Sequence, residues 1–567
     1  MAASTSRLPA SPDAFASGDW AQILPFYEEL AERPLDDVES WLRDWSDLEK
    51  LVGEAYGLAV VAYTTDTGDE EKERRHLRWS SEVAPQAEEQ QVRLAKRLVE
   101  SSYVEDGMEV VIRGFRNQIE LFREANVPLQ AEVAKEVSAY QRTTGQMLVP
   151  WDGEQLTVPQ VEAKLIENDR VLRERAYLAS TEPYIAARDE LAGIFDRLHA
   201  ARQQIAQQAG HRNFRDYQHQ ALNRFDYTPA DCLRWHDAVE EVCVPAVTRV
   251  RERRRRQLGV DRLRPWDTVV DPRGRPPLRP FHDAGELVGG VGGMFAGLDG
   301  ELGRNFAALR DGRLLDLDSR PGKAPGGYCL NLPQRAAAFI FMNAAGTQDD
   351  VFTLLHESGH AFHTFAAARL PRFWEGEYGA EIAEVASMSM ELLAGPRLRR
   401  GDGGFYEDEE SVRRARAENL AKSLWMLCHI ASVDAFQHWI YTDPGGGDAE
   451  QRDRKWLELR ERFEPDVDYE GLRAQRVARW YRQLHIFELP FYYIEYGVAQ
   501  LGAYQIWRNS LHDAPGALAA YRSMLALGNT RPLPELFGAA NACLLFDREG
   551  MRELVELVER ELERLER

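Results

Sequence analysis

The chain has 567 residues, of which 44% are apolar and 29% are charged, and these proportions exclude a disordered or fibrous protein. This length exceeds what a single hydrophobic core usually serves, so we expect at least two structural regions. Acidic residues outnumber basic ones and give a net charge of −22, which argues against nucleic acids and anionic membranes as partners because their phosphates would be repelled.

The N-terminal stretch MAASTSRLPASPDAFASGDW contains no apolar segment of signal-peptide length. No later segment reaches the roughly 18 apolar residues that a transmembrane helix needs. We therefore expect a cytoplasmic protein that does not insert into membranes. Five cysteines are spread without CxxC spacing, so we expect reduced, mostly buried thiols and neither a disulfide framework nor a cysteine zinc site (Cys232, Cys243, Cys329, Cys428 and Cys543).

Most of the chain has the periodicity of amphipathic helices. Charged and apolar residues recur at helical spacing in stretches such as WAQILPFYEELAERPL, EEQQVRLAKRLVE and MRELVELVERELERLER, while alternating strand-like runs are scarce. A basic run, VRERRRRQLG at residues 250–259, is predicted to be a solvated face at the end of a long helix. The fold is therefore predicted to be mainly α-helical.

Two breaks interrupt the helical pattern. RPWDTVVDPRGRPPLRPF is predicted to be a loop or an extended crossing, because proline removes backbone donors. DLDSRPGKAPGGYCLNL precedes AAAFIFMN, whose aromatic and β-branched residues favour a short strand. GTQDD then places Thr347, Asp349 and Asp350 where they can cap a helix. The stretch VFTLLHESGHAFHTFAAARL is accordingly predicted to be helical.

That helix carries HESGH at residues 356–360, an HExxH pattern. Residues four apart on a helix point in nearly the same direction, so His356 and His360 have the spacing of two ligands to one tetrahedral metal ion. Glu357 projects about 100° away and can reach a metal-bound water without occupying the coordination sphere. Two imidazoles that hold zinc and a carboxylate that takes a proton from water make a zinc hydrolase. We therefore predict a zinc site here.

A catalytic zinc site needs a third protein ligand. The extended pattern HExxHxxGxxH is excluded, because its last two positions hold His363 and Ala366. The other solution is a carboxylate from the following acidic helix, EYGAEIAEVASMSMELLAG, in which Glu381 and Glu384 are one turn apart. Spacing does not decide between these two glutamates. His363 lies about 10 Å along the helix axis from the first histidine and is predicted to face the substrate or to support the site.

Several segments resemble the zinc oligopeptidase family of thimet oligopeptidase and oligoendopeptidase F, and in particular its bacterial oligoendopeptidase and Pz-peptidase branch. They include HESGHAFH, EVASMSME, RFDYTPADC, GKAPGGYC, FIFMNAAGT and FELPFYYIEYGVAQLGAYQIW, and they cover at least residues 200–510. Agreement over this length is far more specific than HExxH alone. In the family the third zinc ligand opens an ExxS segment, so the resemblance implies Glu384, in EVAS.

The resemblance also implies a fold, a large helical body that encloses a deep substrate cleft, with a small β-sheet beside a gluzincin-type HExxH helix. Residues 1–195 would form an N-terminal helical region that covers the cleft, and residues 196–567 would form the catalytic domain. FIFMNAAGT resembles the family's active-site edge strand, which binds an extended peptide by backbone pairing. Asn343, Gly346 and Thr347 are therefore predicted, with His363, to contact substrate.

The family also brings a histidine and tyrosines from a late segment to the substrate carbonyl. The matching positions in HIFELPFYYIEYG are His485, Tyr492 and Tyr496, with Tyr493 a weaker candidate. Such donors can share the charge of the oxyanion that forms when water attacks a peptide carbonyl. A further tyrosine of the thimet branch has no match here, where the chain reads GVAQLG, so the full tyrosine set is not carried over.

Together these inferences predict a zinc-dependent endopeptidase that hydrolyses short oligopeptides. One zinc ion per chain would be held by His356, His360 and Glu384, with Glu357 as the general base. The restriction to short peptides is implied by the resemblance alone. The alternatives are a dipeptidyl carboxypeptidase-type exopeptidase, which needs a cationic anchor for the terminal carboxylate, and a catalytically inactive helical scaffold, against which the intact Glu357 argues.

Overall fold

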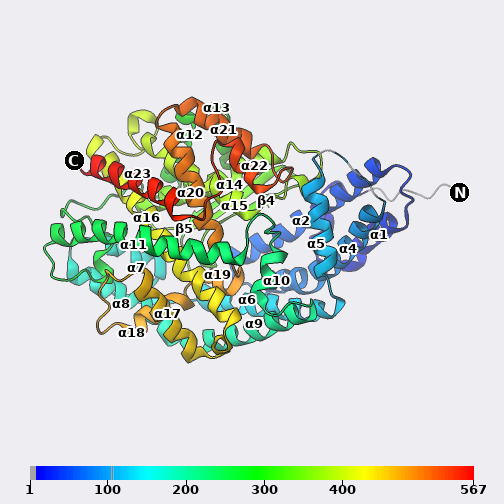
Figure 1. Cartoon of the computed structure of the whole chain (residues 1–567), viewed down its shortest axis with the longest axis horizontal. Helices are drawn as coiled ribbons and strands as arrows, with labels where there is room; N and C mark the ends of the chain where they lie inside the picture. The colour runs from blue at the N-terminus through cyan, green and yellow to red at the C-terminus, as the bar shows by residue number, and fades with distance from the viewer. Residues whose placement is uncertain (1–7, 102, 104, 106) are drawn as a thin grey trace.

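The computed structural model describes residues 8–101, 103, 105 and 107–567, and most of its regular structure is helical (Figure 1). The N-terminal helices lie at one end of the molecule, and the C-terminus lies at the other (Figure 1). Helices α14 (Gln348–Ala367) and α15 (Ala380–Ala394) lie near the middle (Figure 1). The predicted fold class, a mainly α-helical body with a small sheet beside the helix that carries HESGH, is confirmed.

The remaining helices fall into three groups along the chain. The first group is α1 (Trp20–Glu32), α2 (Val38–Thr64), α3 (Glu70–Arg78), α4 (Ala84–Glu100) and α5 (Glu109–Leu121). The second is α6 (Val127–Gly145), α7 (Val158–Glu162), α8 (Arg170–Ala186), α9 (Arg188–Gln208), α10 (Phe214–Ala221), α11 (Pro229–Leu258), α12 (Ala284–Leu298) and α13 (Gly300–Asp311). The third is α16 (Glu409–Thr442), α17 (Ala449–Phe463), α18 (Arg473–Tyr481), α19 (Leu484–Glu488), α20 (Tyr493–Ser510), α21 (Ala514–Leu525), α22 (Leu533–Ala539) and α23 (Arg548–Glu566).

The first group of helices has a hydrophobic core of its own, in which Trp41 and Trp45 are fully buried. One carboxylate, that of Glu49, lies inside this core. It accepts hydrogen bonds from the Tyr27 hydroxyl at 3.0 Å, from Trp45 Nε1 at 2.8 Å and from Gln91 Nε2 at 2.6 Å. Burial raises the pKa of Glu49 to about 7 against these donors, which favour the charged form.

A larger core fills the rest of the molecule, and α20 runs through it. Every residue of α20 from Gly497 to Trp507 is buried, as expected for a helix that other helices surround. Its neighbours are α15, α16, α21 and α23. The segment that carries Tyr492 and Tyr496 therefore lies at the start of a helix that is packed on several sides by other helices.

The sheet beside α14 consists of β3 (Leu315–Asp318), β4 (Tyr328–Leu332) and β5 (Ala337–Ala344), in the order β3-β5-β4. β4 and β5 form an antiparallel hairpin, and β3 runs parallel to β5. The predicted strand is confirmed as β5, but the prediction that FIFMNAAGT forms a free edge is wrong, because β5 is paired on both sides. The segment LDLD, not anticipated as a strand, takes the second side. A separate hairpin joins β1 (Leu148–Trp151) to β2 (Glu154–Thr157).

The N-terminal core reaches the turn between α14 and α15. Trp374, in that turn, packs against Trp45 and Phe115, with ring centroids 4.3 and 5.3 Å apart. The backbone amide of Phe373 donates to Ser46 Oγ over 2.8 Å. α2 also lies along β4. The first core is thus attached to both the sheet and the turn between the two central helices.

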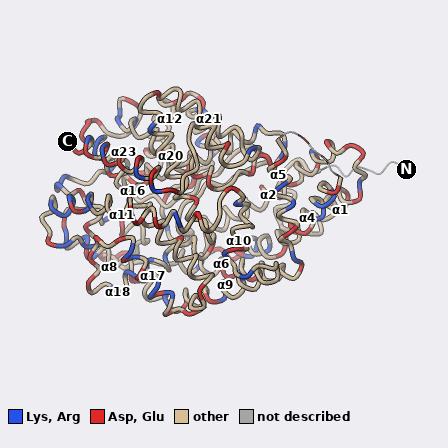
Figure 2. The backbone as a smooth tube through the Cα atoms, viewed as in Figure 1, with Lys and Arg blue, Asp and Glu red and all other residues tan. Residues whose placement is uncertain are grey.

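Charged residues of both signs are interspersed along the chain (Figure 2). The basic run at residues 250–259 ends α11, as predicted, but the predicted solvated face is wrong in part, because Arg251 is buried and its Nη2 lies 3.3 Å from Glu464 Oε1. Arg255 Nε lies 2.7 Å from Glu252 Oε2. In the part of the chain that the structure describes, none of the helices combines the length and the apolar character needed to cross a bilayer.

Candidate active site

Helix α14 starts at a capping box. The Thr347 side chain accepts from the Asp350 amide, and the Asp350 carboxylate accepts from the Thr347 amide over 2.7 Å, so two backbone groups are satisfied at the helix start. The predicted helix is therefore confirmed, and HESGH lies in its interior. This start sets the rotation of α14, and with it the direction in which His356 and His360 point.

Helix α15 crosses α14 at Gly359, the fourth residue of HESGH. A Cβ atom built on Gly359 would lie 2.5 Å from Ser387 Cα and 2.7 Å from the Ala386 carbonyl oxygen, closer than real Cβ atoms approach such neighbours. The two backbones can meet at this distance only because residue 359 has no side chain. Their contact brings Glu384, on α15, to the histidines on α14.

Ligand atoms of His356, His360 and Glu384 lie within 4.8 Å of one another. Glu384 Oε2 is 3.2 Å from His356 Nε2 and 3.6 Å from His360 Nε2. Two ligand atoms of a tetrahedral zinc ion are expected to lie roughly 3.3 Å apart when the bonds to zinc are about 2.0–2.1 Å. The residues therefore fit a zinc ion by donor type and by spacing. Glu381, the alternative that spacing left open, instead accepts from the Tyr227 hydroxyl at 2.7 Å.

Glu391 sets the orientation of the first histidine. His356 Nδ1 lies 2.9 Å from Glu391 Oε1 and donates to it, so Nε2 is the ring atom directed toward Glu384 and available to a metal ion. Sequence reasoning missed this residue. The signal that could have found it is its place on α15 two turns after Glu384, on the same face of the helix.

The charges of the group influence each other strongly. Burial lowers the pKa of His356, but hydrogen bonds to Glu384 and Glu391 outweigh burial and hold it well above its ordinary value. Burial raises the pKa of Glu384, but the two histidines outweigh it and lower this pKa to about 2. Burial lowers the pKa of His360 to about 4. An ionised carboxylate between two imidazoles is a charge arrangement that a divalent cation fits.

Among the described residues, Glu357 takes no part in the hydrogen bonds that link the other charged groups of the cluster. Its side chain is buried, and among the described residues its Oε2 has no hydrogen-bond partner. Burial raises the pKa of Glu357 to about 7. A carboxyl group with an unpaired oxygen and a pKa near neutrality can both take up and give back a proton.

The late segment brings its predicted residues to the same place. The Tyr492 hydroxyl donates to Glu384 Oε1 over 2.6 Å, and His485 Nε2 lies 3.2 Å from the Tyr496 hydroxyl. The rings of Tyr492 and Tyr496 are 5.2 Å apart between centroids, and Tyr493 lies 5.3 Å from Tyr496. The structure therefore gathers the zinc-type group and the three predicted hydrogen-bond donors into one cluster.

A chain of hydrogen bonds determines the tautomer of His485. Arg460, which can only donate, donates to His429 Nδ1 at 3.1 Å, so His429 carries its proton on Nε2 and donates to Gln483 Oε1 at 3.1 Å. Gln483 Nε2 then lies 3.2 Å from His485 Nδ1, which must accept. His485 therefore presents Nε2–H to the Tyr496 hydroxyl. Burial lowers the pKa of His485 to about 4, so the ring is neutral near pH 7.

The predicted substrate contacts have local roles in the fold. Asn343 Nδ2 donates to the carbonyl oxygens of Ala324 and Gly326 and so fastens the glycine-rich loop to β5. Gly346 has a φ of +85°, and the residue after it is the helix cap. His363 is 1% exposed, stacks on Tyr378 and has both ring nitrogens unpaired within the described chain. Substrate binding by these residues stays a prediction.

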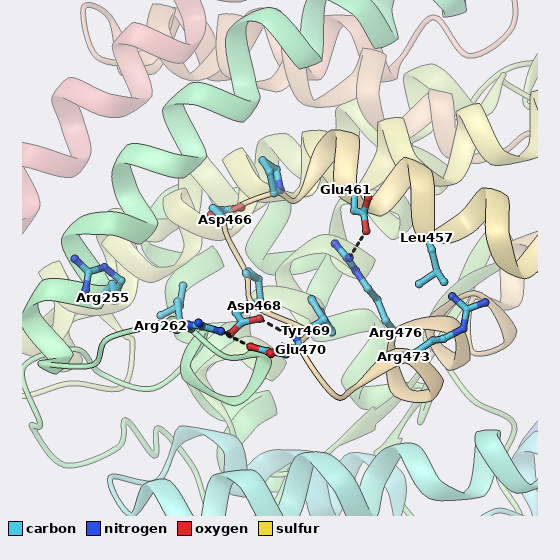
Figure 3. A pocket seen from close by; sticks show the side chains of 13 residues that line it. Arg255, Arg262, Leu457, Glu461, Asp466, Asp468, Tyr469, Glu470, Arg473 and Arg476 are labelled. Carbon is cyan, nitrogen blue, oxygen red and sulfur yellow. Dashed lines mark hydrogen bonds and ion pairs between the residues drawn. The ribbon is translucent and has the colours of Figure 1, made fainter.

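A separate surface hollow lies between α11, α17 and the loop before α18 (Figure 3). Several of its charges are paired within the protein: Arg262 Nη1 lies 3.2 Å from Asp468 Oδ2 and also contacts Glu470, and Arg476 Nη1 lies 3.6 Å from Glu461 Oε1 (Figure 3). None of the predicted site residues lines it. The catalytic prediction therefore concerns the cluster at α14, α15 and α20 alone.

Two family profiles match most of the chain. Peptidase family M3 matches residues 165–296 and 302–556, and the Peptidase M3 N-terminal domain matches residues 14–121. The chain belongs to peptidase family M3. The family predicted from the sequence is thereby confirmed, as is the predicted class of enzyme, a peptidase. The domain boundary predicted at residue 195 stays a prediction.

Individual relatives are similar to parts of this family M3 chain. Oligopeptidase PepF of Bacillus subtilis (strain 168) is 26% identical over 244 residues, which make up 41% of this chain and 34% of that protein. The chromosomal oligoendopeptidase F of Lactococcus lactis subsp. cremoris is 37% identical over 94 residues, 16% of this chain and 15% of that protein. The matched segments span about a third or less of these two relatives.

Solved structures of the family are similar over nearly the whole chain. Pz peptidase A, solved with an inhibitor, has a TM-score of 0.89 at 25% identity and covers 98% of both chains. A putative oligoendopeptidase F also has a TM-score of 0.89, at 26% identity, and covers 96% of this chain and 97% of that one. The structural similarity therefore extends beyond the segments over which the two individual relatives align.

Proposed function

We propose that this member of family M3 is a zinc-dependent endopeptidase that hydrolyses internal bonds of short peptides. The observation that carries the proposal is the grouping of His356, His360 and Glu384 within 4.8 Å of one another, with Glu357 next to the first histidine in the chain. The names oligopeptidase and oligoendopeptidase, which the relatives bear, support short peptides as the substrate class.

His356 and His360 would hold the zinc ion through their imidazole nitrogens, and Glu384 through a carboxylate oxygen. When bound, the ion supplies a Lewis acid that lowers the pKa of a water molecule and polarises the scissile carbonyl. Glu357 takes the proton of the attacking water on its unpaired oxygen and passes it to the leaving amine. The burial of Glu357 shields this proton from bulk solvent between the two transfers.

Tyr496 is the proposed donor to the substrate oxygen. Its hydroxyl accepts from His485 Nε2–H, which leaves its own proton free for the oxyanion that forms on the scissile carbonyl. His485 in the neutral form has a single N–H, which it donates to this hydroxyl, so its proposed role is to position and polarise Tyr496. Tyr492 donates to Glu384 and orients that carboxylate toward the histidines. Gln483 acts through His485, whose tautomer it sets, and is a positioning residue.

Residues 1–195 are proposed to cover the cleft in which the peptide lies, and residues 196–567 to form the catalytic domain. The contact of Trp374 with Trp45 supports this arrangement, because it places the N-terminal core next to the turn between α14 and α15. A covered cleft would exclude folded proteins and admit short, extended peptides.

The test is metal content together with cleavage of an internally quenched peptide whose two ends are blocked. The purified protein should cut internal bonds, lose activity on chelation and regain it when zinc returns. A His356→Ala/His360→Ala variant should bind one metal equivalent fewer and be inactive. Cleavage only after the ends are unblocked would replace the endopeptidase by an exopeptidase. A folded wild-type protein that never cleaves would mean that the scaffold interpretation is correct.

A further inference from the structure

A second group of metal-ligating side chains lies inside the larger core. Cys232 and His236 are four residues apart on α11, and Asp434 and His438 are four residues apart on α16. Members of each pair therefore point to the same side of their helix. Helices α11 and α16 pack against each other, and the two pairs meet between them. The proposed peptidase mechanism uses none of these four residues.

The donor atoms have the spacing of a metal site. Ligand atoms of Cys232, Asp434 and His438 all lie within 4.8 Å of one another. His438 Nε2 lies 3.3 Å from Asp434 Oδ2, so this contact joins the two side chains and leaves Asp434 Oδ1 and His438 Nδ1 as the atoms without a partner among the described residues.

The group is enclosed and incompletely hydrogen bonded. Cys232 and Asp434 are 0% exposed, and His438 is 5% exposed. Asp434 Oδ1 and His438 Nδ1 are buried without a hydrogen-bond partner anywhere in residues 8–101, 103, 105 and 107–567. Buried polar atoms in native proteins are almost always paired, so each exception needs an explanation. Two exceptions within one cluster of cysteine, aspartate and histidine point to a cation.

We propose that Cys232, Asp434 and His438 bind a divalent cation of the zinc class. A thiolate and a carboxylate carry two negative charges, which a divalent ion neutralises, and the imidazole adds a neutral donor. His236 Nε2 donates to Asp434 Oδ2 over 2.8 Å and fixes that carboxylate. Binding expels the proton of the buried Cys232 thiol. Because solvent does not reach these residues, the site is structural, and it joins α11 to α16.

The site supports the turn that carries Tyr492. The His438 ring packs edge-on against Phe491, with centroids 5.5 Å apart. Phe491 has a φ of +68°, a conformation unfavourable for a residue with a bulky side chain, so its neighbours must hold it there. One of them is Gln437, whose Oε1 accepts from the Phe491 amide at 3.1 Å. The cation therefore stiffens a turn whose next residue, Tyr492, hydrogen bonds to the active-site carboxylate.

Cobalt(II) provides a readout of this site that does not depend on peptidase activity. A thiolate ligand gives cobalt(II) a near-ultraviolet charge-transfer band, which a site of two histidines and a glutamate lacks. The full-length background protein carries His356→Ala and His360→Ala, which remove the active-site ligands, and Cys543→Ser, which removes the exposed cysteine. Added cobalt should produce the thiolate band with a stoichiometry of one equivalent per chain.

Cys232→Ser should abolish the band, and Cys243→Ser is the matched control, since that cysteine is also buried on α11. If Cys232→Ser does not fold, His438→Gln, which keeps bulk against Phe491, should weaken cobalt binding at least 10-fold with an unchanged circular dichroism spectrum. A missing band in the background protein, or a band that survives Cys232→Ser, would overturn the proposal. Neither result would affect the zinc assignment of HESGH, because the background lacks that site.

Discussion

Gly359→Ala tests whether the crossing of α14 and α15 determines the geometry of the proposed zinc ligands. The new methyl group would lie 2.5 Å from Ser387 Cα, about 0.9 Å inside the 3.4 Å at which ordinary contact begins. Both neighbours are backbone atoms, so the helices themselves must separate. Overpacking of this kind costs about 1–3 kcal/mol, against a gain of about 0.5–1 kcal/mol from replacing a helical glycine.

The separation acts on the metal because Glu384 lies on one helix and both histidines lie on the other. Metal–ligand distances tolerate deviations of only about 0.2 Å, so a shift of nearly 1 Å should weaken zinc binding by roughly 10- to 100-fold. Zinc affinity is measured by competition with a chromogenic chelator, and the unfolding midpoint by differential scanning calorimetry. Gly359→Ala should lower both.

Gly289→Ala is the matched control. Gly289 is exposed on α12, and a Cβ there would meet nothing within 4 Å. This variant should keep the zinc affinity of the wild type and unfold at the same or a higher temperature. If Gly359→Ala bound zinc as tightly as Gly289→Ala does, the close crossing would not control the ligand geometry, and the reasoning would be refuted.

Four further predictions concern single side chains. Glu357→Gln should abolish turnover and keep its zinc, whereas His356→Ala should lose that zinc equivalent. Near-normal turnover by Glu357→Gln would contradict the assignment of Glu357 as the general base. Tyr496→Phe should lower kcat more than it changes KM, and an effect on KM alone would assign the residue to binding. Gln483→Leu should lower kcat by about 10-fold with zinc retained, because the imidazole that it orients can then adopt either tautomer; an unchanged kcat would argue against the hydrogen-bond chain. The Glu49 carboxyl has a pKa of about 7 in the folded protein against an ordinary value of 4.5, so between these pH values the folded chain binds more protons than the unfolded chain. The free energy of unfolding therefore falls as pH rises through this range, by about 3 kcal/mol in total. Urea unfolding of Glu49→Gln should show a smaller fall over this range, and an unaltered slope would contradict the raised pKa.

The part of the site that lies on one helix was predictable from the sequence. His356, Glu357 and His360 follow from helical spacing, and the capping residues before them locate the helix start. The third ligand was different. Glu381 and Glu384 have equivalent spacing, and the resemblance to a family, not periodicity, favoured the second. In the structure Glu381 is held by the Tyr227 hydroxyl on another segment, a packing contact that favours Glu384 as the proposed ligand.

Pairings between distant segments account for what was missed. The strand β5 was predicted from its own residues, but its central position depends on LDLD, which is separated from it by residues 319–336 and has no strong strand pattern. The series of hydrogen bonds that ends at His485 begins with Arg460 and passes through His429 on α16. Hydrogen bonds of this kind leave no trace in local periodicity, because Arg460, His429 and His485 come from three different helices.

The packing of Trp374 limits how the N-terminal region can be exchanged between related peptidases. Its indole packs against both Trp45 and Phe115 of the first core, yet it belongs to the turn that joins α14 to α15. In a chimera that takes residues 8–121 from another peptidase, the native Trp374 would therefore pack against a core that did not evolve with it. Functional grafts should carry residues 371–376 along with the N-terminal part, and libraries that recombine the two separately should yield mostly insoluble or metal-poor protein.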